Sequence, residues 1–329
     1  MHPLAPSGSL GLGVAAGLAA AAASAVSYLV SRHHGRSAGA SLRLLLLAHV
    51  VMGIACLPLI AWLWPARVPP PARWLPSLIG SAACYLGGQA VVFAALRRMP
   101  ASRLAPLLGL KIVMLAVIVS FLPGTPLDAW QWAAVALSVI AAALLRPAGD
   151  KGPAAGLTGG IGIVLLGCLS FAVSDLCIVG LIDGLQGDGP LGLGRLHAGG
   201  FAMAITYALC GAAAASGLPW AGPRDARDWT AAAQYAAAWL GGMVALYCCF
   251  GTVGAVFGNV LQSTRGLMAV AIGPVLAHAG WHDLEERVDR ATFARRLAAA
   301  ALMTAAIAIY AVGPARPPAT GSKASTSDS

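Results

Sequence analysis

The sequence predicts an all-α integral membrane protein with ten transmembrane helices, arranged as two inverted five-helix repeats. Three observations lead to this prediction. The composition is too apolar for a soluble domain, the chain divides into ten apolar runs of membrane-spanning length, and short motifs recur in the same order in its two halves.

Composition alone sets the class. Only 10% of the 329 residues are charged and 58% are hydrophobic, with a mean hydropathy of +0.77. Soluble domains have about 25% charged residues. The formal net charge of +9 does not indicate nucleic-acid binding, because the basic residues are scattered among the loops without interleaved aromatic residues. Membrane anchoring and topology explain them better.

The first half of the chain contains five apolar runs of about 20 residues, the length that a bilayer requires. They lie at 10–31, 42–64, 75–96, 101–123 and 128–146. The first run lacks a basic n-region and continues past Ala-Ser-Ala to Val30, so it predicts a retained helix rather than a cleaved signal peptide. The short break at 97–100 predicts a tight hairpin between the third and fourth helices.

The second half repeats this plan, with runs at 157–181, 195–217, 229–250, 252–277 and 294–313 and a second tight turn near 251. The predicted organisation is an N-terminal tail at 1–9, a first repeat at 10–150, a second repeat at 151–313 and a disordered C-terminal tail at 314–329. Tryptophans at the predicted span ends fit an interfacial aromatic belt: Trp62, Trp64, Trp74, Trp130, Trp132, Trp220, Trp229 and Trp281.

Three short motifs recur in the same order in both halves. Ala-Val-Ser-Tyr-Leu at 25–29 recurs as Ala-Val-Ser-Asp-Leu at 172–176, and Tyr-Leu-Gly-Gly at 85–88 as Trp-Leu-Gly-Gly at 239–242. Met-Leu-Ala-Val at 114–117 matches Leu-Met-Ala-Val at 267–270. Because each half has five helices, an odd number, the second half must enter the membrane from the opposite side, as in many carriers.

Lys111 and Arg265 are two basic residues inside apolar runs, 154 residues apart, which is also the spacing of the Leu-Gly-Gly motif. A charge at membrane depth is costly and by default marks a functional site. Lys111 lies in the middle of 101–123, and Arg265 lies in the middle of 252–277. Two such residues at equivalent places predict one midplane site between the repeats.

Further polar residues complete the candidate site. Asn259, Gln262 and Arg265 follow one another at intervals of three, which places them on one broad helix face. Guanidinium and amide groups suit an oxyanion or several hydroxyls. Gln89 in the third run is a further candidate substrate-binding residue, with interhelical hydrogen bonding as the alternative.

Asp175 leaves two interpretations open. It is the carboxylate that lies well inside an apolar run, so it can belong to the substrate site or to a proton-coupling step. It can equally form an internal ion pair with Lys111 or Arg265 that locks the two halves together. Two cations against one carboxylate favour an anionic substrate or a deprotonated Lys111, which would then share in proton coupling.

The sequence contains no signature of an enzyme, a metal site or a cofactor site. We find no H-E-x-x-H, G-x-S-x-G or P-loop motif. The seven cysteines fall inside apolar runs without metal-ligand spacing to histidines, so they are interpreted as small packing residues. We therefore predict no catalytic residues, no metal ligands and no cofactor.

The ten-run plan and the segment Ala-Leu-Arg-Arg-Met-Pro-Ala-Ser-Arg-Leu-Ala at 95–105 resemble the EamA-type ten-helix members of the drug/metabolite transporter superfamily. The chain departs from that family in having Lys111 where a proline is common, and Pro123-Gly124-Thr125 where an acidic residue is common. The resemblance implies cytoplasmic termini. The charge count predicts the opposite, because the loops opposite the N-terminus hold fourteen basic residues against five.

Together, these observations predict a secondary transporter that moves a small polar metabolite, with an anion as one candidate class, by alternating access. Carriers of phosphorylated sugars in the same superfamily use buried basic residues in this way. The alternative is a membrane-embedded scaffold or lipid-handling protein with a structural ion pair and no transport. The expected location is the bacterial inner membrane, as a monomer or homodimer, with a coupling proton or ion as a further partner.

Overall fold

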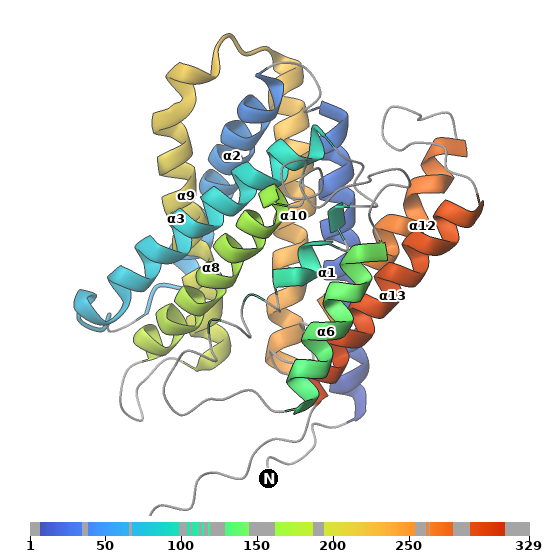
Figure 1. The fold of residues 1–329 in the computed structure, drawn as a ribbon. Helices are drawn as coiled ribbons and strands as arrows, with labels where there is room; N and C mark the ends of the chain where they lie inside the picture. Colours follow the sequence, from blue (N-terminus) through green and yellow to red (C-terminus); the bar gives the residue numbers. More distant parts are fainter. Residues whose placement is uncertain are drawn as a thin grey trace, which may run out of the picture.

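The computed structural model describes residues 7–34, 39–65, 68–98, 104–105, 107–111, 114, 118, 129–144, 162–186, 194–253, 261–262, 264–278 and 290–312. The elements in this part of the chain are helices (Figure 1). In chain order they are α1 (Ser7–His34), α2 (Ala40–Trp62), α3 (Pro71–Leu96), the short 3₁₀ helix η1 (Leu108–Leu110), α6 (Ala129–Leu144), α8 (Gly162–Gln186), α9 (Arg195–Gly217), the 3₁₀ helix η3 (Leu218–Ala221), α10 (Ala226–Val253), α12 (Arg265–His278) and α13 (Arg290–Val312).

The helices have the length and surface of membrane-spanning segments. Five of them, within α1, α2, α3, α8 and the α9–η3 segment, are long and apolar enough to cross a bilayer. Their outer faces leave large apolar side chains uncovered, such as Ile54 (61% exposed) and Leu57 (57%). In water such surface would be unfavourable, whereas lipid tails solvate it. The all-helical membrane class predicted from composition is therefore confirmed.

Tryptophans mark the helix ends, as the sequence indicates. Trp62 at the end of α2 is 80% exposed and Trp220 in η3 is 79% exposed. Trp74 lies in the first turn of α3, and its indole Nε1 donates a hydrogen bond to the Pro69 carbonyl at 3.0 Å. These amphipathic rings suit the interface between the hydrocarbon core and water.

Several observed boundaries differ from the predicted ones, and three of them bear on the predicted tail, turn and site. Helix α1 begins at Ser7, so the predicted tail at 1–9 is shorter than expected. Helix α10 runs on to Val253, past the tight turn expected near 251. Arg265 is the first residue of α12, after a turn at Thr264, so the prediction that it lies in the middle of one continuous helix over 252–277 was wrong.

The most extensive helix packing joins the two predicted halves. Helix α3 packs on α8, α1 on α10, α2 on α9, and α6 on α13; Figure 1 shows α3 beside α8 and α6 beside α13. In each pair, one helix comes from 10–150 and the other from 151–313. The two halves are therefore interleaved, and neither forms a separate domain.

Close helix approach depends on particular glycines. Gly53 of α2 faces Gly211 of α9, and a Cβ added at Gly53 would lie only 2.8 Å from the Gly211 Cα. Gly88 of α3 faces Phe171 of α8, and Gly242 of α10 faces Ala23 of α1. Small residues of this kind let membrane helices pack through van der Waals contact, which drives their association in lipid.

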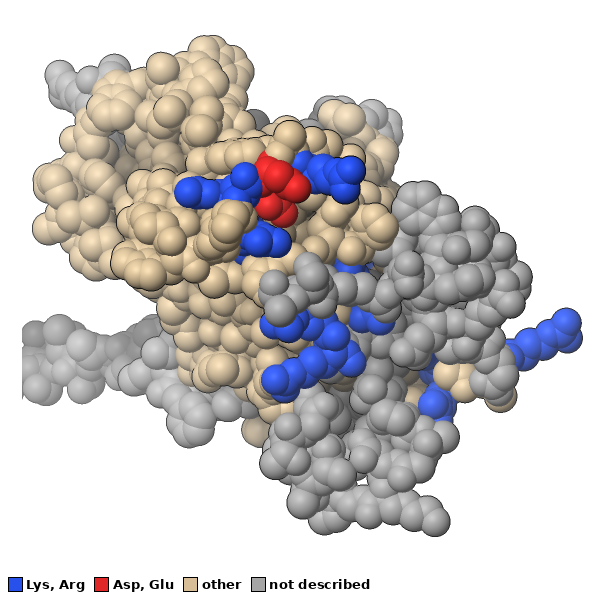
Figure 2. Space-filling model, turned by 90° about the horizontal axis from the view of Figure 1, so that it is seen from above, with Lys and Arg blue, Asp and Glu red and all other residues tan. Residues whose placement is uncertain are grey.

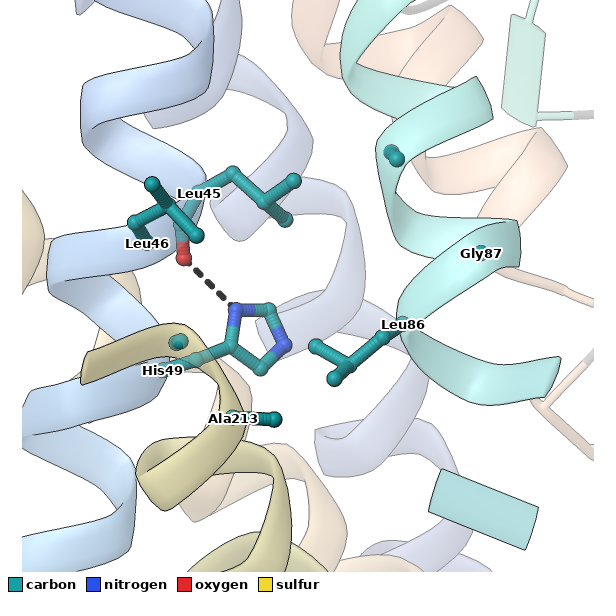
Figure 3. A pocket seen from close by; sticks show the side chains of 8 residues that line it. Leu45, Leu46, His49, Leu86, Gly87 and Ala213 are labelled. Atoms are coloured by element: carbon teal, nitrogen blue, oxygen red, sulfur yellow. Dashed lines mark hydrogen bonds between the residues drawn. The ribbon is translucent and has the colours of Figure 1, made fainter. Parts of the chain in front are cut away.

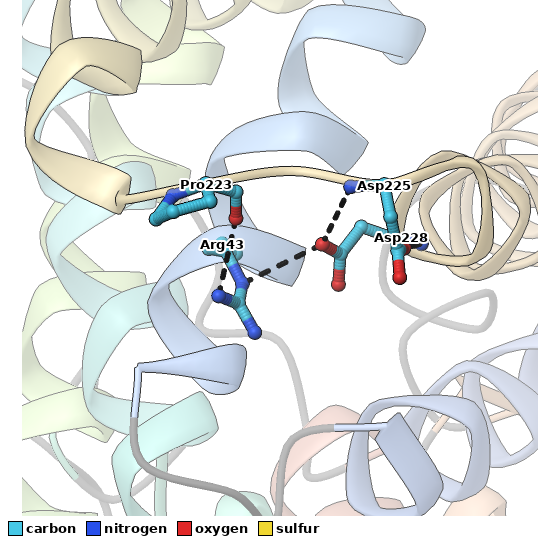
Figure 4. Close-up of polar contacts among 4 residues, drawn as sticks. All are labelled: Arg43, Pro223, Asp225 and Asp228. Atoms are coloured by element: carbon cyan, nitrogen blue, oxygen red, sulfur yellow. Dashed lines mark hydrogen bonds and ion pairs between the residues drawn. The ribbon is translucent and has the colours of Figure 1, made fainter.

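Polar contacts fix both ends of the α2–α9 pair. At one end, the His197 Nε2 lies 2.8 Å from the Leu63 carbonyl. At the other end, Arg43 donates from Nη1 to the Pro223 carbonyl at 3.2 Å and pairs with Asp228 at 3.6 Å (Figure 4). Figure 2 looks onto this second end of the bundle and shows Lys and Arg side chains gathered there around acidic ones.

The start of α10 at this end is capped within its own first turn. The Asp225 Oδ1 accepts a hydrogen bond from the Asp228 backbone N–H at 2.9 Å, and the Asp228 Oδ2 accepts one from the Asp225 N–H at 3.3 Å. This reciprocal arrangement is a capping box with aspartate at both positions. Asp228 therefore serves both the helix start and the ion pair to α2.

Candidate functional site

Lys111 and Asp175 form an ion pair between the fourth predicted span and α8. Lys111 directly follows η1, and its Nζ lies 2.7 Å from the Asp175 Oδ2. The two side chains retain 19% and 36% of their exposed surface, so the pair is not sealed within the protein. The first cation of the candidate site is thus neutralised by the carboxylate that the sequence singles out.

Arg265 is the first residue of α12. It is half-buried, and its charge acts electrostatically on the Tyr28 hydroxyl of α1 and on the Cys168 thiol of α8. Lys111 also acts electrostatically on Cys168, a fully buried residue, so both cations lie in the neighbourhood of this thiol. Among the residues that the structure describes, no carboxylate lies within ion-pair distance of Arg265.

Gln262 joins the segment before α12 to α1. It is 7% exposed, and its Nε2 donates a hydrogen bond to the Ser24 Oγ at 3.0 Å. Ser24 and Tyr28 lie one turn apart on α1, so Gln262 and Arg265 both face the same stripe of that helix. The Gln262 Oε1 is buried and has no hydrogen-bond partner in the described part of the chain. Asn259 lies outside the described residues.

Gln89 belongs to a buried hydrogen-bond network rather than to a free surface. It is 0% exposed; its Nε2 donates to the Tyr85 hydroxyl at 3.2 Å, and its Oε1 accepts from the Tyr235 hydroxyl at 3.2 Å. The network links α3 to α10, helices of different halves. The amide nitrogen and the amide oxygen of Gln89 therefore each have a hydrogen-bond partner, as buried polar atoms usually do.

Aromatic rings connect this network to Tyr28 beside Arg265. The ring of Tyr235 stacks on that of Trp239 at a centroid distance of 6.0 Å and an angle of 6°, and Trp239 lies 6.2 Å from Tyr28. The Trp239 indole donates to the Tyr207 hydroxyl at 2.7 Å. We did not predict Tyr207, Tyr235 or Trp239 as site residues. One signal was present, because Trp239 stands where Tyr85 stands in the repeated Leu-Gly-Gly motif.

A cavity of about 300 Å³ lies between α2, α3 and α9, with His49 in its wall (Figure 3). The His49 Nδ1 donates to the Leu45 carbonyl at 2.7 Å, and its Nε2 is buried without a hydrogen-bond partner in the described residues. The remaining wall is apolar: Leu45, Leu46, Leu86, Gly87, Ala90, Ala213 and Ala214. Such a lining suits hydrocarbon better than a polar metabolite.

Within the described residues, no group of three or more His, Cys, Asp or Glu side chains is arranged to hold a metal ion. Of the six cysteines whose side chains are described, Cys56, Cys168, Cys210 and Cys249 are buried. They occupy positions where a small, weakly polar side chain packs well.

Comparison with known proteins supports the predicted family resemblance. Residues 11–146 match the model of the EamA-like transporter family, consistent with the drug/metabolite transporter superfamily. No curated protein matches the chain. A solved structure, described only as the crystal structure of a protein, is similar to it with a TM-score of 0.54 and 15% identity over 93% of this chain and 96% of the other. That similarity concerns the fold alone.

Proposed function

We propose that this protein is a secondary transporter that moves a small polar metabolite by alternating access between two inverted five-helix repeats. The family match to residues 11–146 supports membrane transport of a small molecule. The proposed substrate site lies between the halves and includes Lys111, Asp175, Arg265, Gln262, Gln89 and Asn259. The proposed location is the bacterial inner membrane.

The inverted repeat is supported by the packing pattern. Exchanging the halves turns the α3–α8 pair into the α10–α1 pair, and it maps the α2–α9 and α6–α13 pairs onto themselves. The repeated glycines share their surroundings. Gly88 and Gly242 each contact the first helix of the other half, whereas a Cβ at Gly87 or Gly241 would meet nothing within 4 Å. A pseudo-two-fold axis between the halves accounts for both observations.

Interrupted helices at equivalent positions support a midplane site. The 3₁₀ helix η1 at Leu108–Leu110 directly precedes Lys111, and the turn at Thr264 directly precedes Arg265. The first intrahelical bond of α12 runs from the Met268 N–H to the Thr264 carbonyl at 3.0 Å. Carriers of this kind use discontinuous helices at the membrane midplane to present backbone groups and charges to their substrates.

The observation on which the proposal depends is that each half supplies one cation to the first helix of the other half. Lys111 of the first half pairs with Asp175 of α8. Arg265 of the second half begins α12, which packs on α1, and its charge acts electrostatically on Tyr28 there. Relative movement of the halves would change both contacts together. A site built from both repeats in this way can open to either side of the membrane as the halves rock.

The second candidate is a membrane-embedded scaffold or lipid-handling protein without transport. The Lys111–Asp175 ion pair and the apolar cavity beside His49 favour it. In that case the charged residues would hold the halves together and the cavity would accept a hydrocarbon chain.

Uptake of an untargeted metabolite mixture into proteoliposomes tests the first candidate against the second. The purified chain should move at least one class of polar metabolite above the background of protein-free liposomes. The flux should fall when Lys111 or Arg265 is replaced by Gln. Absence of flux for every metabolite class, in protein that remains folded, would contradict the transporter proposal.

A further inference from the structure

Tyr28 and Asp175 occupy equivalent positions in the two halves. Each is the fourth residue of the repeated motif, Ala-Val-Ser-Tyr-Leu at 25–29 and Ala-Val-Ser-Asp-Leu at 172–176. The structure places these motifs on α1 and α8, the first long helix of each half. Four of five residues are identical, and the one difference exchanges a neutral phenol for a carboxylate.

The surroundings of the two residues are equivalent as well. Asp175 pairs with Lys111, the cation on the fourth span of the first half, at 2.7 Å. Arg265, the matching cation of the second half, acts electrostatically on the Tyr28 hydroxyl, α1 packs along α12, and Gln262 just before α12 bonds Ser24 one turn from Tyr28. In each half, the residue at this motif position therefore lies on the helix that receives the cation-bearing segment of the other half.

This difference leaves the two cations unequal. The charge of Lys111 is compensated by Asp175, whereas Arg265 acts electrostatically on the Tyr28 phenol and has no ion-pair partner among the described residues. A half-buried guanidinium that no described carboxylate neutralises is a favourable position for an anion. We infer that Arg265 binds the oxyanion group, carboxylate or phosphate, of the transported substrate, and that Tyr28 keeps this cation available by standing where the other half has Asp175. The inference rests on the proposed transport function.

The local geometry suits an oxyanion. A guanidinium offers a planar fork of donors that matches two oxygens of a carboxylate or phosphate. Arg265 is also the first residue of α12, where the backbone N–H groups of the first turn precede the first intrahelical bond, made by Met268. The positive end of the helix dipole therefore adds to the charge of the side chain. Lys111, already held by Asp175, is a positioning residue for the halves.

Thermal unfolding of the purified full chain in detergent tests this assignment. The probes are sodium phosphate and sodium acetate, each compared with sodium chloride at equal ionic strength. The unfolding midpoint of the wild type should rise with one of them above the chloride series, because a ligand that binds only the folded state stabilises it. The phosphate and acetate arms distinguish a phosphate site from a carboxylate site. No rise above chloride with either probe would overturn the inference.

Substitutions show which residue binds the anion. Arg265→Gln and Tyr28→Asp should raise the half-saturating anion concentration about tenfold or more, through loss of a charge-assisted contact or through its replacement by an internal ion pair. The double variant Lys111→Gln/Asp175→Asn should change the half-saturating concentration less. The peripheral control Arg43→Gln should leave it unchanged. If the double variant loses the response while Arg265→Gln keeps it, the assignment is wrong.

Two further results separate this inference from the transport proposal. If Tyr28→Asp fails to fold, judged by size-exclusion chromatography, the comparison of Arg265→Gln with the double variant still decides the assignment. Flux in proteoliposomes that is unaffected by Arg265→Gln would overturn the inference and leave transport standing. Anion binding that depends on Arg265, without flux of any metabolite, would overturn transport and leave the anion site standing.

Discussion

At the scale of single residues, polar side chains in this protein are placed in pairs that cross from one half to the other. Lys111 meets Asp175, Gln262 meets Ser24, and Gln89 meets Tyr235. In lipid, no water is present to hydrogen-bond a polar group that lacks a protein partner. Each such contact therefore limits which helices can pack side by side. These side chains therefore specify the packing of the halves in addition to forming a candidate site.

The Lys111–Asp175 pair gives a first prediction. Asp175→Asn leaves the Lys111 ammonium without its counter-charge, and we expect a loss of about 1–3 kcal/mol in unfolding free energy, less than for a fully buried pair because both side chains are partly exposed. Adding Lys111→Gln should restore most of that loss. The check is the thermal unfolding midpoint of the three variants in one detergent. A double variant no more stable than Asp175→Asn would mean that the pair does not act as a unit.

The Gln89 network gives a second prediction. Gln89→Leu leaves the Tyr85 and Tyr235 hydroxyls without this partner inside the bundle, and we expect a cost of about 1–3 kcal/mol. Adding Tyr235→Phe should recover part of the loss. It removes the Tyr235 hydroxyl, which has lost its acceptor once position 89 is leucine. The thermal unfolding midpoint in one detergent measures both variants against the wild type. Equal stability of wild type and Gln89→Leu would show that the network contributes nothing.

At the scale of the elements, helix packing depends on where glycines fall along each helix. The α2–α9 contact brings Gly53 and Gly211 face to face, so that neither position has room for a Cβ. In contrast, Gly87 and Gly241 meet no neighbouring atom within 4 Å of an added Cβ. Glycine is therefore required by close approach at some positions and merely present at others.

Alanine substitution separates these two kinds of glycine. Gly53→Ala and Gly211→Ala place a methyl group 2.8 Å and 2.7 Å from the opposing Cα, and each should cost about 1–3 kcal/mol as the helices move apart. Gly87→Ala and Gly241→Ala should be neutral, or stabilising by up to about 1 kcal/mol, because alanine favours helix. Thermal unfolding in detergent compares the four variants. The explanation fails if Gly53→Ala is as stable as Gly87→Ala.

At the scale of the whole molecule, the two halves are interleaved, and their contacts are related by exchange. Neither half supplies all the partners of its own polar residues. Asp175 forms an ion pair with Lys111 of the first half, and Gln262 donates a hydrogen bond to Ser24 of that half. This dependence agrees with the proposed site between the halves, which relative movement of the halves would expose. The same arrangement makes the orientation of the halves testable.

Opposite insertion of the halves is tested by labelling cysteines introduced at exposed loop positions. Trp64 follows α2 at the end where His197 contacts Leu63, whereas Trp220 lies in η3 at the end where Arg43 contacts Pro223. Cysteines placed at 64 and 220 should react with a membrane-impermeant maleimide from opposite sides in right-side-out and inverted vesicles. The unmodified chain gives the background of its native thiols. Labelling of both positions from the same side would contradict the inverted topology.

Sequence alone determined the class of the molecule and much of its helix plan. Apolar runs of spanning length depend only on local composition, so the helices α2 (Ala40–Trp62) and α9 (Arg195–Gly217) lie within two residues of their predicted bounds. Charge inside an apolar run singles out Lys111, Arg265 and Asp175, because it is a local property of the chain.

Only the tertiary structure decided how those residues are used. The pairing of Asp175 with Lys111 rather than with Arg265, the start of α12 at Arg265, and the approach of Tyr28 to that arginine all depend on how helices far apart in the chain cross. The sequence shows which residues are unfavourable in lipid, because that free energy depends on the type of each residue. It does not show which partner compensates each of them, because that depends on distances set by the packing of the whole bundle.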